Sequence, residues 1–196
     1  KNVNFRKLSY AYPSKNSEVL NNISITINKN DCIGIKGKSG SGKSTFLDLF
    51  MGLLKSQNGT INVNEKKLEI FDNNKWQSII SYIPQETFLI DDTIYKNINL
   101  FNKYKDTKLD KILSDLNLKS LIEDLDNGIN TNIGERGLKL SGGQKQRLGI
   151  ARALIQDNQI IIFDESTSAL DDLNENKILD LINKLKKEKT IIIVSH

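Results

Sequence analysis

The sequence predicts an α/β fold, with one core sheet and helices packed on it. Three observations lead to this prediction. A glycine-rich segment, residues 37–44, lies between a strand pattern and a helix pattern. The apolar run Ile160–Phe163 ends in two acidic residues, and helix and strand patterns alternate through the last third of the chain. Because strands joined through a helix pair in parallel, we expect parallel pairs in the core sheet.

The N-terminal third is predicted to be rich in strands, because short apolar segments are separated there by turn signals. The predicted strands are Val3–Tyr10, Ile23–Ile27, Asp31–Lys36 and Thr60–Val63. A helix is predicted directly after the glycine-rich segment, since apolar residues between Phe46 and Leu54 recur at helical spacing.

The middle of the chain, from about Gln85 to Leu140, has a helical pattern broken by loops rich in Asn and Asp. Its clearest predicted helices are Leu109–Leu118 and Leu121–Leu125. In the last third the predicted elements are helix Gly143–Ile155, strand Ile160–Phe163, helix Leu173–Lys187 and strand Thr190–Val194. We therefore expect one core that is interrupted by a helical insert.

The composition is that of one soluble globular domain: 196 residues, 38% apolar and 27% charged. A membrane-spanning helix needs about 20 apolar residues, and the longest runs here, Ile160–Phe163 and Ile191–Val194, are far shorter. The net charge of +4 comes from interspersed charges of both signs, so we expect no nucleic-acid partner. The single cysteine, Cys32, excludes an internal disulfide and is expected to be a small buried core residue, since it lies in a strand pattern.

The segment Gly37-Lys38-Ser39-Gly40-Ser41-Gly42-Lys43-Ser44 satisfies the P-loop pattern for phosphate binding. Glycines let the backbone wrap with its N–H groups toward phosphate oxygens, and the following helix adds its positive N-terminal end. Lys43 supplies a cation for the phosphates and Ser44 a hydroxyl for Mg²⁺. The alternative is a glycine-rich turn with an incidental lysine. The predicted nucleotide-binding residues here are Gly37, Ser39, Gly40, Ser41, Gly42, Lys43, Ser44 and Thr45.

The apolar strand Ile160–Phe163 is followed directly by Asp164 and Glu165. Side chains alternate between the two faces of a strand, so the two carboxylates are expected to have different roles. Asp164 is predicted to hold Mg²⁺, largely through water. Glu165 is predicted to orient and deprotonate an attacking water. The alternative is a pair of solvated acids at the end of the strand.

The segment Leu140-Ser141-Gly142-Gly143-Gln144 resembles the signature motif of the ATP-binding domains of ABC transporters, and the continuation Lys145–Leu154 resembles the family as well. It offers a second phosphate-binding helix start, with a hydroxyl, bare backbone amides and a positive dipole end. The resemblance implies that Ser141, Gly142, Gly143 and Gln144 bind the nucleotide held by the P-loop of a second copy. The expected partner is thus the same chain, in a head-to-tail homodimer closed through ATP.

The resemblance extends over essentially the whole chain, 1–196, and implies one ABC ATPase domain with ATP and Mg²⁺ as cofactors. The implied fold is a P-loop NTPase (RecA-like) core with a mixed β-sheet, an N-terminal antiparallel β-subdomain and an inserted α-helical subdomain. We expect the core to comprise residues 1–85 and 150–196, and the helical subdomain about 86–149.

The resemblance also assigns roles to residues outside the P-loop and the signature. Tyr12 resembles the aromatic residue that stacks on adenine, with a strand-edge tyrosine as the alternative. Gln85 resembles the glutamine that contacts Mg²⁺ and the attacking water, and His196 the histidine that contacts the γ-phosphate; both are expected to be catalytic. The segment Ser168–Asp171 is similar to the loop that communicates across the dimer. The alternative for His196 is a terminal residue without a role.

The segment Thr131–Gly137, with Glu135 and Arg136, resembles exporters, where it touches loops of the transmembrane domains. The segment Ile83–Ile98 indicates the same and is most similar to bacterial exporters of lipids or lipid-linked saccharides. Glu135 and Arg136 could equally form a surface ion pair of little energetic value. The resemblance therefore implies a domain at the cytoplasmic face of the inner or plasma membrane, working with a transmembrane domain of the same transporter.

The chain begins in a strand pattern without a methionine and ends directly after one, so we expect a fragment of a longer polypeptide. A transmembrane domain would precede Lys1, and a C-terminal segment would follow His196.

Three other classes of ABC protein are alternatives. An importer subunit would usually lack the Glu135–Gly137 segment, a DNA-repair ATPase would carry a long coiled coil between Lys43 and Ser141, and a translation-type ATPase would carry two such cassettes.

Overall fold

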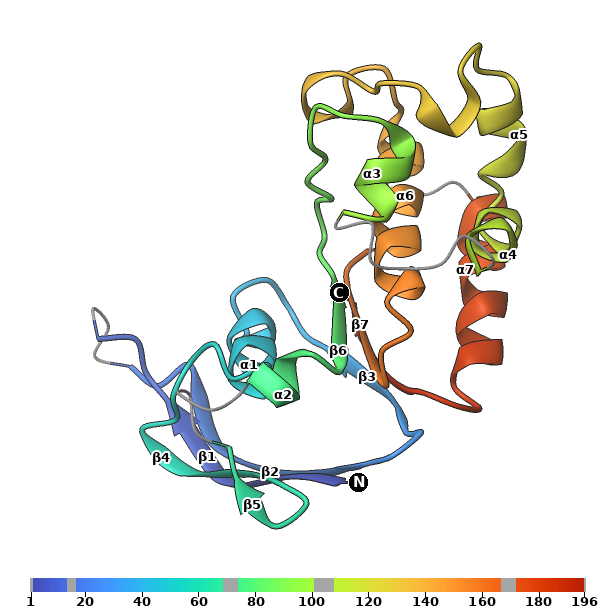
Figure 1. The fold of residues 1–196 in the computed structure, drawn as a ribbon. Coiled ribbons are helices and arrows are strands. Elements are labelled where there is room, and N and C mark those ends of the chain that lie inside the picture. The colour runs from blue at the N-terminus through green and yellow to red at the C-terminus, as the bar shows by residue number, and fades with distance from the viewer. Residues whose placement is uncertain (1, 14–16, 69–73, 101–107, 167–171, 196) are drawn as a thin grey trace.

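The computed structural model describes residues 2–13, 17–68, 74–100, 108–166 and 172–195 (Figure 1). These residues form two four-stranded sheets with helices packed on and between them. The predicted α/β class is confirmed. Parallel and antiparallel pairings are both present, and each kind is confined to one of the two sheets.

The first sheet is antiparallel, and its strand order is β2-β1-β4-β5. The strands are β1 (Asn2–Tyr10), β2 (Leu20–Asn28), β4 (Asn58–Val63) and β5 (Lys66–Lys67). Its buried face packs on helix α1 (Lys43–Phe50). The rings of Phe5 and Phe46 lie 4.9 Å apart there. This sheet therefore supports the helix that follows the glycine-rich segment.

The second sheet is parallel, and its strand order is β3-β8-β7-β6. The strands are β3 (Cys32–Lys36), β6 (Ile80–Ile83), β7 (Ile160–Asp164) and β8 (Thr190–Ser195). Residues of β7 alternate between two hydrophobic cores: Ile160 and Ile162 pack toward α1, whereas Ile161 and Phe163 pack toward the helices on the other face. Burial on both faces explains why the first four residues of β7, Ile160–Phe163, are all apolar.

The helices beyond Gln85 gather on the far face of the parallel sheet, away from the antiparallel sheet (Figure 1). They are α3 (Ile94–Ile98), α4 (Leu109–Asp115), α5 (Lys119–Glu123), α6 (Gly142–Ile155) and α7 (Asp172–Leu185), with 3₁₀ turns at Gly128–Asn130 and Glu135–Gly137. Within the described ranges, no helix combines the length and the apolar character needed to cross a bilayer.

Helix α6 runs through both parts of the predicted division of the chain. It packs against α3 and α4 and also against β6. The predicted boundary between residues 149 and 150 falls inside this helix, and the division into core and helical subdomain remains a prediction.

Two details differ from the sequence-based expectations. Cys32 is exposed, so the expectation of a buried core residue was wrong. It begins β3, an edge strand in which exposed and half-buried residues alternate, and it lies on the exposed face. In addition, β5, β6 and the short helix α2 (Asn74–Gln77) were not predicted. In α2, Trp76 Nε1 donates to the carbonyl of Phe50 at 2.7 Å, which fixes the end of α1.

Candidate nucleotide-binding site

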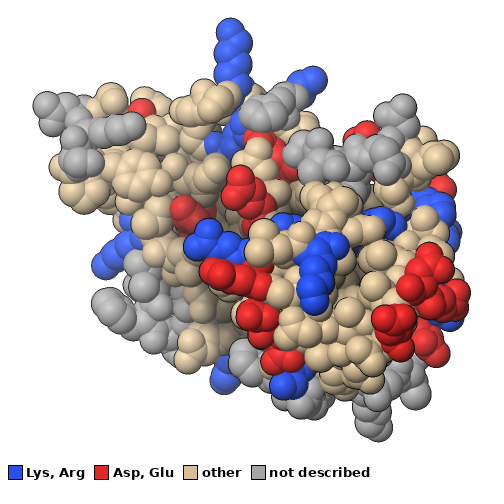
Figure 2. Space-filling view, turned by 90° about the horizontal axis from the view of Figure 1, so that it is seen from above, with Lys and Arg blue, Asp and Glu red and all other residues tan. Residues whose placement is uncertain are grey.

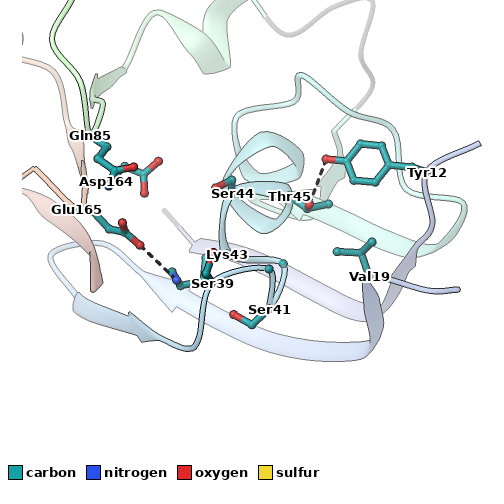
Figure 3. A pocket seen from close by; sticks show the side chains of 12 residues that line it. Tyr12, Val19, Ser39, Ser41, Lys43, Ser44, Thr45, Gln85, Asp164 and Glu165 are labelled. Atoms are coloured by element: carbon teal, nitrogen blue, oxygen red, sulfur yellow. Dashed lines mark hydrogen bonds and ion pairs between the residues drawn. The ribbon is translucent and has the colours of Figure 1, made fainter. Parts of the chain in front are cut away.

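A cavity of about 440 Å³ opens at the carboxyl ends of the parallel strands (Figure 3). Its lining residues are Tyr12, Val19, Ser39, Gly40, Ser41, Gly42, Lys43, Ser44, Thr45, Gln85, Asp164 and Glu165. Strand β3 leads into the glycine-rich loop, β6 leads toward Gln85, and β7 ends at Asp164. Because parallel strands present their carboxyl ends at one edge, residues far apart in the sequence meet here.

The glycine-rich loop needs glycine at specific positions. Gly40 and Gly42 have φ of +79° and +93°, a region that side chains rarely allow. A Cβ on Gly37 would lie 2.5 Å from Ser41 Oγ, and one on Gly42 would lie 3.0 Å from the carbonyl of Val19. The loop ends at the N-terminus of α1, where free backbone N–H groups favour an anion. This geometry fits a phosphate chain.

The side chains of Lys43 and Glu165 point toward one another at the end of the cavity away from Tyr12, Lys43 from the start of α1 and Glu165 from the end of β7 (Figure 3). Lys43 Nζ lies 3.2 Å from Glu165 Oε1 and donates to the carbonyl of Gly37 at 2.7 Å. The two side chains are only 9% and 11% exposed. Glu165 has φ of +48°, so the chain turns sharply where β7 ends. The sequence predicted both residues for the site, but not their ion pair.

Asp164 lies on the face of β7 that packs on α1. Two residues that were not predicted for the site, Tyr82 and Asp48, interact with it there. Tyr82 Oη donates to Asp164 Oδ2 at 2.7 Å. The pKa of Tyr82 is raised, mainly by burial and to a smaller extent by this hydrogen bond. Burial also raises the pKa of Asp48, with a further contribution from the charge of Asp164. Asp48 lies four residues after Ser44 in α1, a spacing that could have indicated it.

Ser44, Gln85 and Asp164 offer the oxygen ligands that Mg²⁺ prefers, and all three line the cavity. In the part of the chain that the structure describes, no group of three or more His, Cys, Asp or Glu residues could hold a metal by itself. Mg²⁺ usually binds through one or two carboxylates together with phosphates and water. The residues present therefore fit a Mg²⁺ ion that arrives with a phosphate chain.

Tyr12 lies at the end of the cavity opposite the two carboxylates (Figure 3). Its hydroxyl is 3.1 Å from Thr45 Oγ1. The ring of Tyr10 packs edge-on against it, with centroids 5.1 Å apart. An aromatic ring beside the phosphate loop offers a face on which a base can stack, and stacking by Tyr12 stays a prediction.

The family model that describes an ABC transporter matches residues 20–168. The chain belongs to the ABC transporter family. It is 40% identical over 99% of its length to a protein of Rickettsia prowazekii (strain Madrid E) named as an export ATP-binding/permease protein. It is 34% identical over 100% of its length to ATP-dependent lipid A-core flippase 2 of Colwellia psychrerythraea.

The fold also matches a solved ABC structure. The structure of a bacterial Atm1-family ABC exporter with ATP bound has a TM-score of 0.91 and 31% identity, and the match covers 100% of this chain. The chain spans about a third of these relatives, 34% of each. The predicted resemblance to exporter-type ABC proteins is confirmed.

The ABC signature residues lie at the N-terminus of α6, and among the described residues none of them lines the cavity. Ser141 Oγ accepts from the Gln144 backbone N–H at 3.3 Å, and Gln144 Oε1 accepts from the Ser141 N–H at 2.8 Å. This capping box satisfies two backbone donors at the start of the helix. The side chain of Gln144 is thus engaged in shaping the turn. Of the remaining expected site residues, His196 and Ser168–Asp171 lie outside the described residues.

The two segments similar to ABC exporters lie side by side. Thr93 and Asn132 form an antiparallel bridge, and the Ile94 N–H donates to the carbonyl of Thr131 at 3.1 Å. Next to them is a groove of about 450 Å³. Its lining residues are Gln85, Glu86, Thr87, Phe88, Leu89, Arg136, Gly142, Lys145 and Gln146. Phe88 is 66% exposed there.

Arg152, a residue of α6, connects this groove to the helix that begins with the signature residues. Its Nε donates to the carbonyl of Asn97 at 2.7 Å, and its Nη1 donates to the carbonyl of Phe88 at 2.8 Å. The Asn97 side chain is fully buried and bonds both backbone groups of Ile90. Arg152 was not predicted as a functional residue, because its role depends on contacts with residues more than fifty positions away.

Proposed function

We propose that this chain is the ATP-binding and ATP-hydrolysing part of a membrane exporter. The observation that supports this proposal best is the convergence of Lys43, Asp164 and Glu165 on one cavity, next to a glycine loop that fits phosphates. The names of the relatives, export ATP-binding/permease protein and ATP-dependent flippase, favour export over import.

In the proposed reaction each side chain has one task. Loop N–H groups, the N-terminus of α1 and Lys43 hold the phosphates of ATP. Ser44, Gln85 and Asp164 would hold Mg²⁺, which neutralises phosphate charge when bound. Glu165 orients a water and accepts its proton, and such a general base contributes about 10²–10⁴-fold in rate. Tyr12 stacks on the base, and His196 is expected to contact the γ-phosphate.

Two substitutions test this assignment. Glu165→Gln should bind ATP like the wild type but hydrolyse it about 10²–10⁴-fold more slowly, because the amide keeps the shape and loses the basic oxygen. Lys43→Ala should lose most ATP binding. Calorimetry measures affinity and phosphate release measures rate. Unchanged affinity in Lys43→Ala, or unchanged hydrolysis in Glu165→Gln, would contradict the proposed site.

We further propose that the groove around Phe88 docks cytoplasmic loops of a transmembrane domain. An exposed aromatic side chain at the rim of a groove is a typical anchor site for a partner. Arg152 joins this groove to the helix that begins with the signature, so movement of the docked loop would reach α6. In the assembled transporter the domain would lie at the cytoplasmic face of the membrane.

Cross-linking in the intact protein tests the docking. Because Cys32 is exposed, Cys32→Ser provides the background. Cysteines introduced as Glu86→Cys or Glu135→Cys should then cross-link to cysteines in the loops of the membrane domain. Lys66→Cys is the matched control, because Lys66 is exposed on β5 of the antiparallel sheet, and this cysteine should not cross-link to the membrane domain. An active transporter in which neither Glu86→Cys nor Glu135→Cys reacts would contradict docking at this groove.

A further inference from the structure

The segment that carries Tyr12 is held by a side chain from a distant part of the sequence. Strand β1 ends at Tyr10, so the backbone groups of Ala11 lie beyond the end of the strand. The Ala11 N–H donates to Gln57 Oε1 at 2.9 Å, and Gln57 Nε2 donates to the Ala11 carbonyl at 2.8 Å. One amide side chain thus satisfies both backbone groups of Ala11, as a neighbouring strand residue would.

The place of Gln57 in the fold explains this contact. Gln57 directly precedes β4, and Asn58, the first residue of β4, is paired with Ser9. The side-chain amide of Gln57 therefore extends the β1–β4 pairing past the last backbone pair. It fixes the chain at Ala11, one residue before the ring of Tyr12.

Two further contacts hold Tyr12 itself. Its hydroxyl is 3.1 Å from Thr45 Oγ1, and the ring of Tyr10 packs edge-on against it. The backbone before the ring, the ring itself and its hydroxyl are each in contact with a different residue: Gln57, Tyr10 and Thr45. An aromatic platform held in this way loses little conformational entropy when a base stacks on it.

We propose that Gln57 is a positioning residue for base recognition, because it orients Tyr12 for stacking through the backbone of Ala11. This inference rests on the proposed function, in which Tyr12 stacks on the base of ATP. Gln57 does not line the cavity among the described residues. It should therefore influence affinity for the base and leave affinity for the phosphates unchanged.

Comparison of two ligands separates these effects: MgATP, and magnesium tripolyphosphate, which has no base. In Gln57→Met the length is kept and both hydrogen bonds are lost, so ATP should bind about 2- to 10-fold more weakly, with tripolyphosphate unchanged. Gln57→Glu keeps the acceptor for the Ala11 N–H but places a carboxylate oxygen against the Ala11 carbonyl, so it should weaken ATP binding at least as much as Gln57→Met. Gln77→Met is the matched control, because Gln77 Nε2 also bonds a backbone carbonyl, that of Met51, away from Tyr12.

Coupling to Tyr12 distinguishes positioning from general stability. In the intact protein, Tyr12→Ala should weaken the binding of ATP but not that of tripolyphosphate. Adding Gln57→Met should cause no further loss of ATP affinity. The inference would be overturned if Gln57→Met lost affinity for ATP and tripolyphosphate equally, or if Gln57→Met lowered ATP affinity as much in Tyr12→Ala as in the wild type. Either result would leave the proposed function intact. If Tyr12→Ala itself leaves ATP affinity unchanged, base stacking on Tyr12 is wrong, and the role of Gln57 falls with it.

Discussion

At the residue scale, the site depends on backbone positions as much as on charged groups. Gly42 precedes Lys43 and has φ of +93°, and a Cβ there would meet Leu20, the first residue of β2, and Val19 directly before it. A side chain at this position would force the loop away from the strand. The direction in which Lys43 leaves the loop, and therefore its approach to Glu165, would change with it.

Gly42→Ala should consequently weaken ATP binding by about 5- to 150-fold, since the strain of a non-glycine residue at such a φ is on the order of 1–3 kcal/mol. Gly34→Ala is the control, because a Cβ on Gly34, in neighbouring β3, would meet nothing within 4 Å. Calorimetric ATP titration of both variants measures the difference. Equal affinities would show that the loop tolerates the side chain.

At this scale the sequence identified residues whose type is required by their chemistry, and their roles in nucleotide binding and hydrolysis stay predictions. Gly42, Lys43 and Glu165 line the cavity as expected. The prediction was wrong for Cys32, because a strand pattern does not reveal whether a strand lies at the edge of its sheet. Tyr82 was missed because nothing local relates it to Asp164, 82 positions away.

At the scale of elements, side chains of the connecting segments tie the helical part to the parallel sheet. Asp157, in the turn between α6 and β7, accepts from Lys108 at 2.5 Å and from Lys189 at 2.7 Å. Lys108 directly precedes α4, and Lys189 directly precedes β8. Two hydrogen bonds hold the pKa of Asp157 below its ordinary value; the one from Lys108 has the larger effect and the one from Lys189 the second largest. One carboxylate thus joins three elements.

A carboxyl with a lowered pKa in the folded state stabilises the fold above its unfolded pKa of about 3.9 and loses this effect as the pH falls through the folded value. Asp157→Asn should therefore lower the free energy of unfolding at pH 7 by at most about 1 kcal/mol, since the side chains of Asp157 and Lys108 are more than half exposed. The difference from the wild type should shrink in acid and in high salt.

Urea unfolding at several pH values measures this effect. Asp180→Asn, at an exposed position of α7, removes the same charge and serves as the control. A difference that persists unchanged from pH 7 into acid would mean that Asp157 acts through its packing and not through its charge.

Elements with a clear apolar pattern were predicted well, whereas β5, β6 and α2 were missed. Helix α6 was predicted as Gly143–Ile155 and extends from Gly142 to Ile155. Strand β6 was missed because its four residues include the polar Ser81, which is buried and donates to the carbonyl of Ala153 at 2.9 Å. A polar residue satisfied by a distant helix does not produce an apolar pattern. Yet β6 is the strand that leads to Gln85.

At the scale of the whole molecule, the two helix starts that the sequence predicts to bind phosphate lie apart, and among the described residues the start of α1 borders the cavity whereas the start of α6 does not. Helix α1 begins beside Lys43, whereas α6 begins at the capped Ser141, outside the cavity lining of the described residues. On the face seen in Figure 2, basic and acidic side chains are both spread over the surface, with a group of acidic side chains near one edge. A second copy could present its α6 to the phosphates held by α1.

This arrangement predicts a dimer that depends on ATP. Glu165→Gln should bind ATP without hydrolysing it and should form a head-to-tail pair around two nucleotides, observed as a doubled mass by gel filtration with light scattering. Adding Ser141→Arg should restore the monomer, because a bulky charge in the capped turn would block the phosphate contact. Exposed Lys66→Arg serves as a control at a site away from α6. A dimer that forms without ATP, or one that persists with Ser141→Arg, would mean that the two copies do not share their sites through the signature helix.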